Sequence, residues 1–259
     1  MKVFITGASS GIGEALAREY HRRFPGLRIG LVARREAELE RVAAALAGAS
    51  VHRYALDVTD REALARAAAD FVAAAGAPPD VVIAGAGISA GTVTGEAEDA
   101  AMFRRIVDVN VTALFDTFSP FVPAMRARRS GTLVGIASVA GIRGLPGAGA
   151  YSASKAAAIA YLESARVELR GSGVRVVTIA PGYIRTPMTR RNAYPMPFLT
   201  DADVFARRAV DTIARGRSYA VIPWQMRGVS VALRLLPNWL FDALFARAPR
   251  KRRATENRR

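Results

Sequence analysis

Short, continuously apolar segments alternate with longer segments in which apolar residues recur at helical spacing, from the N-terminus to about residue 223. Strands that are apolar throughout and are joined by helices are typical of a parallel sheet covered on both faces. The predicted strands are 2–6, 28–33, 51–56, 80–84, 131–138 and 174–180, and the predicted helices are 14–24, 35–47, 60–75, 98–129 and 150–170. We therefore expect one α/β domain of three layers, with a doubly wound parallel sheet between two layers of helices.

The pattern changes at about residue 225. Residues 224–246 are densely apolar, but Arg234, Pro237 and Asp242 interrupt them, so no membrane-spanning helix is predicted. Pro237 starts a new turn, which divides the segment into two amphipathic helices. A basic tail, expected to be solvated and frayed, contains Arg247, Arg250, Lys251, Arg252, Arg253, Arg258 and Arg259. We predict a first unit over 1–225 and an apolar helical extension with this tail over 226–259.

Composition narrows the chemistry that is available. The 259 residues, of which 51% are hydrophobic, suffice for one large α/β domain. The absence of cysteine excludes disulfides, thiolate zinc sites and cysteine nucleophiles. With only His21 and His52 present, we expect neither a metal site nor a Ser-His-Asp triad. The first residues form a strand that leads directly into a turn and do not look like a signal segment, so we expect a cytoplasmic protein.

The formal net charge of +15 would draw the chain towards polyanions such as nucleic acid, acidic membrane surfaces or phosphorylated ligands. Part of this charge belongs to the basic tail, for which solvent exposure is the default explanation. No recognised nucleic-acid-binding motif accompanies the charge, and a basic patch without such a motif is weak support. We therefore expect no nucleic-acid partner.

A glycine-rich turn connects the first predicted strand with the first predicted helix, and it reads Thr6-Gly7-Ala8-Ser9-Ser10-Gly11-Ile12-Gly13. The N-terminus of a helix offers unpaired backbone N–H groups and the positive end of the helix dipole, and glycines let a pyrophosphate approach the backbone closely. The turn therefore predicts a dinucleotide site in a Rossmann-type fold.

The second predicted strand ends in Arg34 and Arg35, about twenty residues beyond the turn. An acidic residue near this position holds the ribose hydroxyls of NAD, whereas an arginine accommodates the additional phosphate of NADP. The two arginines also fit the start of the charged helix 35–47. Because there are two arginines and no acid here, we favour NADP(H) over NAD(H).

Candidate chemistry follows from the stretch Tyr151-Ser152-Ala153-Ser154-Lys155. Its spacing places Tyr151 and Lys155 on one helix face. The pKa of a phenol is near ~10 in water, and a nearby ammonium lowers it, so such a tyrosine can give a proton to an alkoxide or take one from an alcohol. The same spacing also arises by accident on helix surfaces. Here Ser138 ends an apolar strand, and strand ends meet the glycine turn at one sheet edge.

Together these residues resemble those of the short-chain dehydrogenase/reductase family, from Met1 to about Pro223. The matching positions, in order and at family-like spacing, are Thr6-Gly7-x-x-x-Gly11-x-Gly13, Asp57, Asn110, Ser138, Tyr151-x-x-x-Lys155 and Pro181-Gly182-x-x-Thr186. The resemblance implies that residues 1–225 are an NAD(P)-binding catalytic domain that transfers a hydride between NADP(H) and a carbonyl or alcohol group. It also implies a homo-oligomer, a dimer or tetramer, that forms through helices 98–129 and 150–170.

The resemblance implies a role for each matching residue. Tyr151 would be the general acid in reduction and the base in oxidation, and Ser138 would hydrogen-bond the substrate carbonyl oxygen. Lys155 would hold the nicotinamide ribose and lower the pKa of Tyr151, and Asn110 would hold a water that links Lys155 to solvent. The implied cofactor contacts are Gly7, Ser10, Ile12 and Gly13 with the phosphates and ribose, Ser9 and Arg34 with the 2′-phosphate, Asp57 and Val58 with the adenine, Ile184 and Thr186 with the nicotinamide, and in addition Gly11, Arg35, Gly85, Pro181 and Gly182.

One position departs from the family pattern. The turn after strand 80–84 reads Ala84-Gly85-Ala86-Gly87, so Gly85 stands where the family carries an asparagine. That asparagine braces neighbouring strands, and its replacement puts the rigidity of this turn in doubt. The positions that handle protons are unaffected.

The substrate side is predicted from residues 187–200, which occupy the place of the family's variable lid. Met188, Tyr194, Met196 and Phe198 would form an apolar wall, which suits an apolar ketone or aldehyde better than a sugar; the alternative is that these side chains pack on the core. Segment 226–259 is expected to be a subunit interface or a pocket cap, with contact to an anionic membrane surface as the alternative. The alternative function is a non-catalytic module that senses NADP(H).

Overall fold

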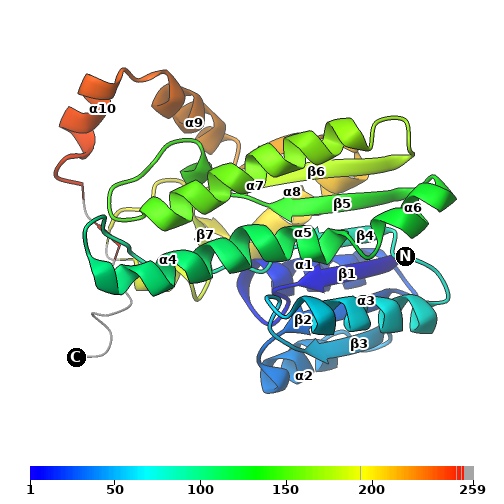
Figure 1. The fold of residues 1–259 in the computed structure, drawn as a ribbon. Helices are drawn as coiled ribbons and strands as arrows, with labels where there is room; N and C mark the ends of the chain where they lie inside the picture. The colour runs from blue at the N-terminus through cyan, green and yellow to red at the C-terminus, as the bar shows by residue number, and fades with distance from the viewer. Residues whose placement is uncertain (193, 249, 252, 254–259) are drawn as a thin grey trace.

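Seven parallel strands form one sheet between two layers of helices in the computed structural model of this chain (Figure 1). The structure describes residues 1–192, 194–248, 250, 251 and 253, so the predictions for Arg252, Arg258 and Arg259 lie outside the described residues. The strands, in their spatial order, are β3 (Ser50–Ala55), β2 (Arg28–Ala33), β1 (Lys2–Thr6), β4 (Val81–Ala84), β5 (Gly131–Ile136), β6 (Val174–Pro181) and β9 (Tyr219–Ile222). The order reverses between β1 and β4, which confirms the doubly wound parallel sheet.

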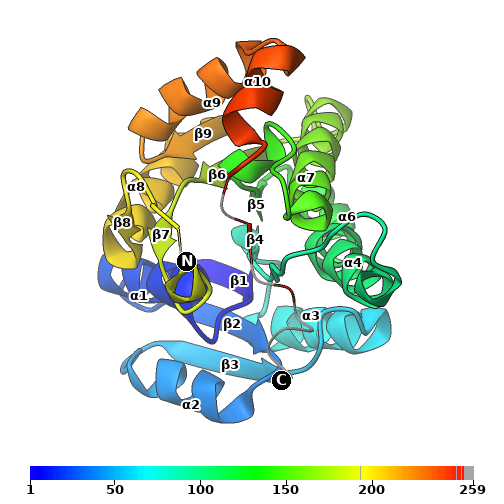
Figure 2. The same cartoon turned by 90° about the vertical axis from the view of Figure 1, so that its left-hand side faces the viewer.

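Helices cover both faces of this sheet, because successive strand residues point to opposite faces and are apolar on each. Figure 2 shows a layer of helices on each side of the sheet. Val3 and Ile5 pack with the helices on one face, whereas Phe4 packs with those on the other. The first face carries α1 (Gly11–Arg23), α2 (Glu36–Ala44) and α8 (Ala202–Ala214), and the second carries α3 (Arg61–Ala75), α5 (Ala113–Phe118), α6 (Val122–Arg128) and α7 (Gly149–Glu168). Burial of each such side chain contributes about 1.5–3 kcal/mol, so the fold rests on these two apolar cores.

The helical region predicted over 98–129 is divided into several helical pieces. The pieces are η1 (Ala97–Asp99), α4 (Ala100–Val107), a π-helical turn η2 (Asp108–Thr112), α5 and α6. Pro120 and Pro123 have no N–H, so the backbone hydrogen bonds of α5 cannot continue into α6. The π turn carries Asn110, whose side chain bonds to neighbouring elements instead of facing solvent.

The C-terminal extension contains the two predicted helices, α9 (Gln225–Leu235) and α10 (Asn238–Phe245). α9 begins beside the predicted boundary at residue 225, and the division into two units stays a prediction. Within the described ranges, every helix is too short or too polar to cross a bilayer.

A fully solvated tail is a wrong prediction for Lys251 and Arg253. Arg253 forms a β-bridge with Gly91, and Lys251 Nζ donates to Ser89 Oγ at 2.6 Å. The physical reason is local charge, since Arg253 pairs with acidic side chains on η1. Lys251 and Arg253 therefore lie back on the fold.

Candidate active site

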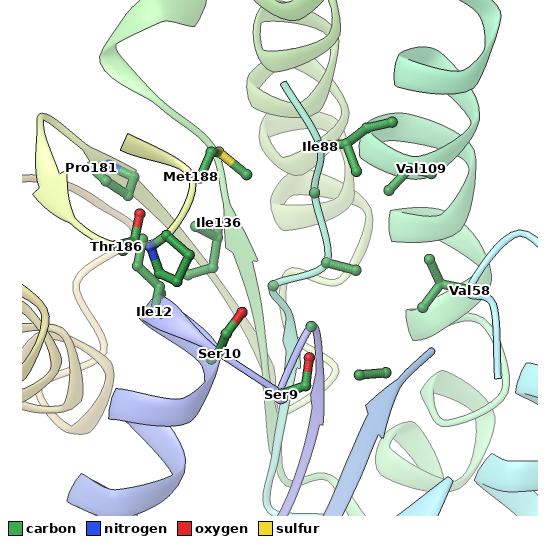
Figure 3. Close-up of a pocket in the computed structure, with 18 of the residues that line it drawn as sticks. Ser9, Ser10, Ile12, Val58, Ile88, Val109, Ile136, Pro181, Thr186 and Met188 are labelled. Atoms are coloured by element: carbon green, nitrogen blue, oxygen red, sulfur yellow. The ribbon is translucent and has the colours of Figure 1, made fainter. Parts of the chain in front are cut away.

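A cavity of about 290 Å³ opens where the strand order reverses, at the carboxyl ends of β1 and β4 (Figure 3). Ligands of open α/β sheets bind in this crevice. Every site residue predicted from the sequence lines the cavity except Asn110, which lies behind it. Figure 3 shows the Ser9 and Ser10 hydroxyls directed into the cavity, with Thr186 and Met188 on one side and Val58 and Ile88 on the other.

The backbone of the glycine turn forms the floor of the cavity, because its glycine positions have no room for a side chain. Gly7 and Gly11 have φ angles of +74° and +58°, which glycine adopts without strain. A Cβ atom on Gly13 would lie 2.2 Å from the Gly7 carbonyl oxygen, and one on Gly7 would lie 2.8 Å from the backbone of Ala86. α1 begins at Gly11, so the unpaired backbone N–H groups of its first turn lie at the glycine turn. The turn fits the pyrophosphate of a dinucleotide.

The two arginines that follow β2 have different neighbours. Arg35 Nη2 lies 3.3 Å from both Ser9 Oγ and Ser10 Oγ, and Arg34 Nη1 lies 4.0 Å from Asp57 Oδ2. Both line the cavity, but it is Arg35, and not the predicted Arg34, that shares a site with Ser9. The two serine hydroxyls and the Arg35 guanidinium are hydrogen-bond donors that line the same part of the cavity.

Asp57 is held by a residue that sequence reasoning missed, Arg105 on α4. Asp57 Oδ1 accepts from the Thr59 N–H at 3.0 Å and from Thr59 Oγ1 at 2.8 Å. Burial raises the pKa of Asp57, but the bonds from Thr59 and Arg105 outweigh it, so this pKa lies below its ordinary value. No motif marks Arg105, because only the packing of α4 beside β3 brings it to the cavity.

Tyr151, Ser138 and Lys155 come together on the other side of the glycine turn. Ser138 follows β5, and Tyr151 lies in the first turn of α7. The Lys155 Nζ atom lies one turn further, 5.9 Å from the centre of the Tyr151 ring, and donates to the Ile136 carbonyl at 2.8 Å. Strand and helix thus place a hydroxyl, a phenol and an ammonium around one point of the cavity.

The pKa values of these groups follow their burial. Lys155 is only 5% exposed, and this burial lowers the pKa of its ammonium group to about 8. Burial also raises the pKa of Tyr151, while a hydrogen bond with Ser138 acts in the opposite direction. The net shift at Tyr151 is upward, contrary to the predicted lowering by Lys155. The reason is that desolvation of the buried phenol outweighs its hydrogen bond with Ser138.

Asn110 joins the elements that carry the site. Its Nδ2 donates to the Ile88 carbonyl at 3.1 Å and to Ser154 Oγ at 2.9 Å, and its Oδ1 accepts from the Ile88 N–H at 2.9 Å. A Cβ atom on Gly87 would lie 3.3 Å from Asn110 Oδ1 and 3.6 Å from Lys155 Nζ. Asn110 and Lys155 therefore approach the same point of the backbone.

The turn at Gly85 is braced from β1. The N–H groups of Gly85 and Ala86 both donate to Thr6 Oγ1, at 3.2 and 3.3 Å. A Cβ atom on Gly85 would lie 2.9 Å from the Thr6 carbonyl oxygen. The Thr6 hydroxyl thus holds the turn in the absence of the asparagine side chain.

The loop after β6 lines the cavity beside the glycine turn, where a Cβ atom on Gly11 would lie 3.1 Å from the Thr186 side chain. Pro181, Gly182, Ile184 and Thr186 line the cavity, and a short strand pair, β7 (Ile184–Arg185) with β8 (Thr200–Asp201), supports the loop. Thr189 Oγ1 donates to the Ile184 carbonyl at 2.6 Å, which fixes the turn that follows.

Of the predicted lid wall, only Met188 lines the cavity (Figure 3). Tyr194 packs edge-on against Tyr183, Met196 contacts Asn192, and Phe198 is 49% exposed. Residue 193 of the predicted lid lies outside the described residues. Within the described ranges, no group of three or more histidine or acidic side chains is arranged to hold a metal ion.

Comparison with known proteins agrees with this arrangement. The sequence model of the family described as short chain dehydrogenase matches residues 1–195. An uncharacterized oxidoreductase of Myxococcus xanthus (strain DK1622) is 41% identical over 241 residues, which cover 92% of this chain and 94% of the relative.

Two solved structures share the fold. One is an alcohol dehydrogenase from the archaeon Thermococcus sibiricus complexed with 5-hydroxy-NADP, at 27% identity and a TM-score of 0.75, covering 86% of this chain and 96% of its own. The other is a 3-oxoacyl-[acyl-carrier protein] reductase with bound NAD from Brucella melitensis, at 31% identity and a TM-score of 0.73, covering 85% and 88%. Chains of this fold therefore bind either form of the nicotinamide dinucleotide.

Proposed function

The chain belongs to the short-chain dehydrogenase family, and from that premise we propose that it transfers a hydride between NADP(H) and a carbonyl or alcohol substrate. As a member of this family it is an oxidoreductase of alcohol or carbonyl groups that binds a nicotinamide dinucleotide. One observation carries the more specific proposal: Ser138, Tyr151 and Lys155 line the same cavity as the glycine turn, although they lie about 125 to 150 residues further along the chain.

The bound nicotinamide supplies the hydride, and the residues of this chain hold the cofactor and move the proton. Gly7, Ser10, Gly11, Ile12 and Gly13 would face the phosphates and ribose. Asp57, with Val58, would face the adenine, and Gly85 the adjoining ribose. Pro181, Gly182, Ile184 and Thr186 would close over the nicotinamide. Glycine at positions 7 and 13 supports this fit, since a Cβ atom there would collide with the backbone of Ala86 or Gly7 and distort the turn.

We favour NADP(H) over NAD(H) because two guanidinium groups line the cavity after β2, one of them beside Ser9. Arg35 bonds to Ser9 and Ser10, and Arg34 lies beside it with 62% of its side chain exposed. A 2′-phosphate placed here would accept charge-assisted hydrogen bonds from both, and no carboxylate follows β2 directly to claim ribose hydroxyls.

Proton transfer is assigned to Tyr151. Its phenol gives a proton to the substrate oxygen during reduction and takes one back during oxidation. The Ser138 hydroxyl hydrogen-bonds that oxygen, and Lys155 stabilises the phenolate and holds the nicotinamide ribose. Asn110, which approaches the same backbone point as Lys155, would hold the water that returns the proton to Lys155 from solvent.

The substrate proposed here is a ketone or aldehyde with an apolar body, because Met188 and Ile184 line the substrate side of the cavity. The alternative is a non-catalytic module that senses NADP(H); the complete Ser138, Tyr151 and Lys155 set speaks against it.

Two surfaces are candidates for self-association of a protein that we expect in the cytoplasm. Phe103, Phe115 and Val167 are exposed on α4, α5 and α7, where a dimer or tetramer contact is expected. The helices α9 and α10 expose large apolar side chains as well, and we assign them to a subunit contact ahead of an anionic membrane surface.

The experiment that tests the proposed function is oxidation of NADPH, followed by absorbance, with a panel of aryl ketones, aliphatic aldehydes and sugars. We expect turnover of the aryl ketones with NADPH and slower turnover with NADH. Tight NADPH binding without turnover of any carbonyl compound would favour the sensing module, and preference for sugars would contradict the apolar substrate.

A further inference from the structure

Residues 250, 251 and 253 return from α10 to the loops beside Tyr151. After α10 the chain, dark red in Figure 2, runs back across the carboxyl edge of the sheet. Arg253 forms a parallel bridge with Gly91, in the loop after β4. A Cβ atom on Gly147, in the loop before α7, would lie 2.8 Å from Arg250 Cβ. The C-terminal strap, residues 250, 251 and 253, therefore lies between the two loops that flank Tyr151.

Arg253 anchors this strap. Its Nε lies 3.0 Å from Asp99 Oδ2, and its Nη2 lies 3.3 Å from Glu96 Oε2. Asp99 also accepts from the Val93 N–H at 2.9 Å, and this bond, together with Arg253, lowers the pKa of Asp99. Because Asp99 is only 4% exposed, the anchor is a fixed point rather than a surface ion pair.

Lys251 lies between these anchor points and faces Tyr151. Its Nζ is 5.5 Å from the centre of the Tyr151 ring and donates to Ser89 Oγ at 2.6 Å. An ammonium carries three donors, and Ser89 takes one of them. Among the described residues, no carboxylate forms an ion pair with Lys251, and burial lowers its pKa to about 8. A half-buried ammonium with one neutral partner would be stabilised by an anion that binds beside it.

We propose that Lys251 binds a carboxylate of the substrate, so that the enzyme reduces oxo acids and oxidises the corresponding hydroxy acids. The inference rests on the proposed function, since Tyr151 marks where the reacting carbonyl oxygen lies. Lys251 and Lys155 approach the same ring, at 5.5 and 5.9 Å. A substrate that reaches both Tyr151 and Lys251 therefore carries its carboxylate a few bonds from the carbonyl carbon.

The single ammonium selects a carboxylate over a phosphate. A carboxylate carries one charge at neutral pH, which one ammonium neutralises, whereas a phosphate dianion is bound best by several cations or by an arginine fork. The apolar lining at Met188 accommodates the body of the same molecule. The proposed substrate therefore combines a carboxylate, bound by Lys251 of the strap, with an apolar body.

The test compares acids with their neutral esters. The probes are benzoylformate and 3-benzoylpropionate, each with its methyl ester, and NADPH oxidation is measured for the unchanged protein and for Lys251→Met, Lys251→Arg and Arg234→Met. Because Lys251→Met removes a hydrogen bond to the charged carboxylate, we expect kcat/KM for the acids to fall about 10- to 100-fold, mainly through KM. The values for the esters should stay within about twofold. Lys251→Arg retains most of the preference. Arg234→Met, which removes an exposed charge from α9, changes neither class.

A binding measurement provides a second readout. Calorimetric titration of 3-benzoylpropionate into protein saturated with NADP⁺ cannot lead to reduction, because no hydride is available. We expect Lys251→Met to weaken this binding about 10-fold or more, and Arg253→Gln to weaken it in the same direction because the strap loses its anchor to Asp99.

The outcomes separate the inference from the proposed function. Equal kcat/KM for acid and ester in the unchanged protein, or an equal loss of both in Lys251→Met, overturns the carboxylate assignment while the oxidoreductase function stands. An absence of turnover with every probe and with both NADPH and NADH counts against the proposed function. In that case the calorimetric comparison of Lys251→Met with the unchanged protein still decides whether Lys251 binds a carboxylate.

Discussion

The side-chain amide of Asn110 exchanges two hydrogen bonds with the backbone of Ile88, at 2.9 and 3.1 Å. This pair ties the π turn between α4 and α5 to the loop after β4. A third bond, to Ser154, extends the tie to α7, and Ser154 in turn donates to the Tyr151 carbonyl at 2.8 Å. The elements that carry the proton-transfer groups are therefore held to one another by a single buried amide.

Asn110→Ala should destabilise the fold as well as lower the activity. The Asn110 side chain is buried, at 1% exposed, and the substitution leaves the Ile88 N–H and C=O groups without their partner. We therefore expect the free energy of unfolding to fall by about 2–4 kcal/mol. Urea denaturation measures it. Arg166→Ala, at an exposed position of α7, serves as the control and should change this free energy by less than about 0.5 kcal/mol. An unchanged unfolding midpoint for Asn110→Ala would show that the tie is not structural.

Substitution of the arginines after β2 should lower kcat/KM for NADPH more than kcat/KM for NADH. Arg35→Ala removes the guanidinium beside Ser9 and Ser10, and we expect kcat/KM for NADPH to fall about 10- to 100-fold while that for NADH stays within about threefold. Arg34→Ala should act in the same direction. Arg66→Ala, exposed on α3, is the matched control. Equal losses with both cofactors would mean that the arginines do not bind a 2′-phosphate.

Lys155→Met should abolish activity and yet stabilise the protein at neutral pH. Burial lowers the pKa of Lys155 from 10.5 to about 8, so folding below pH 8 keeps an ammonium in an unfavourable site. Removing this ammonium should raise the free energy of unfolding at pH 7 by about 1–3 kcal/mol. The loss of its hydrogen bond to the Ile136 carbonyl reduces this gain. This advantage shrinks as the pH rises from about 8 to 10.5, because the unfolded chain then also loses the proton. Thermal unfolding at several pH values measures it, and a pH-independent difference would contradict the buried charge.

The apolar side chains of α9 and α10 should support self-association. Trp224, Leu235 and Trp239 are 73%, 76% and 72% exposed, and exposed apolar surface of this kind marks sites of protein or membrane contact. We expect Leu235→Glu with Trp239→Glu to lower the sedimentation coefficient of the oligomer and to leave the melting temperature unchanged. The full chain should remain in the supernatant with anionic vesicles. Co-sedimentation that the double variant abolishes would instead assign these helices to a membrane surface.

Much of the site was predictable because it depends on strand ends. The apolar strands mark where β1, β4, β5 and β6 stop, and parallel strands stop at one edge, so the glycine turn, Ser138 and the loop at Pro181 had to meet. The spacing of Tyr151 and Lys155 placed both on one face of α7.

The remaining features depend on packing that no local pattern encodes. Arg105 reaches Asp57 only because α4 lies beside the end of β3, and Lys251 reaches Tyr151 from a distance of 100 residues along the chain. The pKa of Tyr151 rises because burial outweighs its neighbours, and burial is a property of the folded chain. The break after Phe118 had a sequence signal in Pro120 and Pro123, which the apolar periodicity obscured.

The central claim, that the Tyr151 phenol transfers the proton, is tested most directly by Tyr151→Phe. The variant loses one oxygen atom, so we predict that kcat/KM for the best carbonyl substrate falls by about 10²- to 10⁴-fold while the Kd for NADPH, measured by fluorescence, stays within about threefold. Tyr161→Phe, ten residues further along α7 and half-buried, should retain activity. Turnover by Tyr151→Phe at the rate of the unchanged protein would contradict the account.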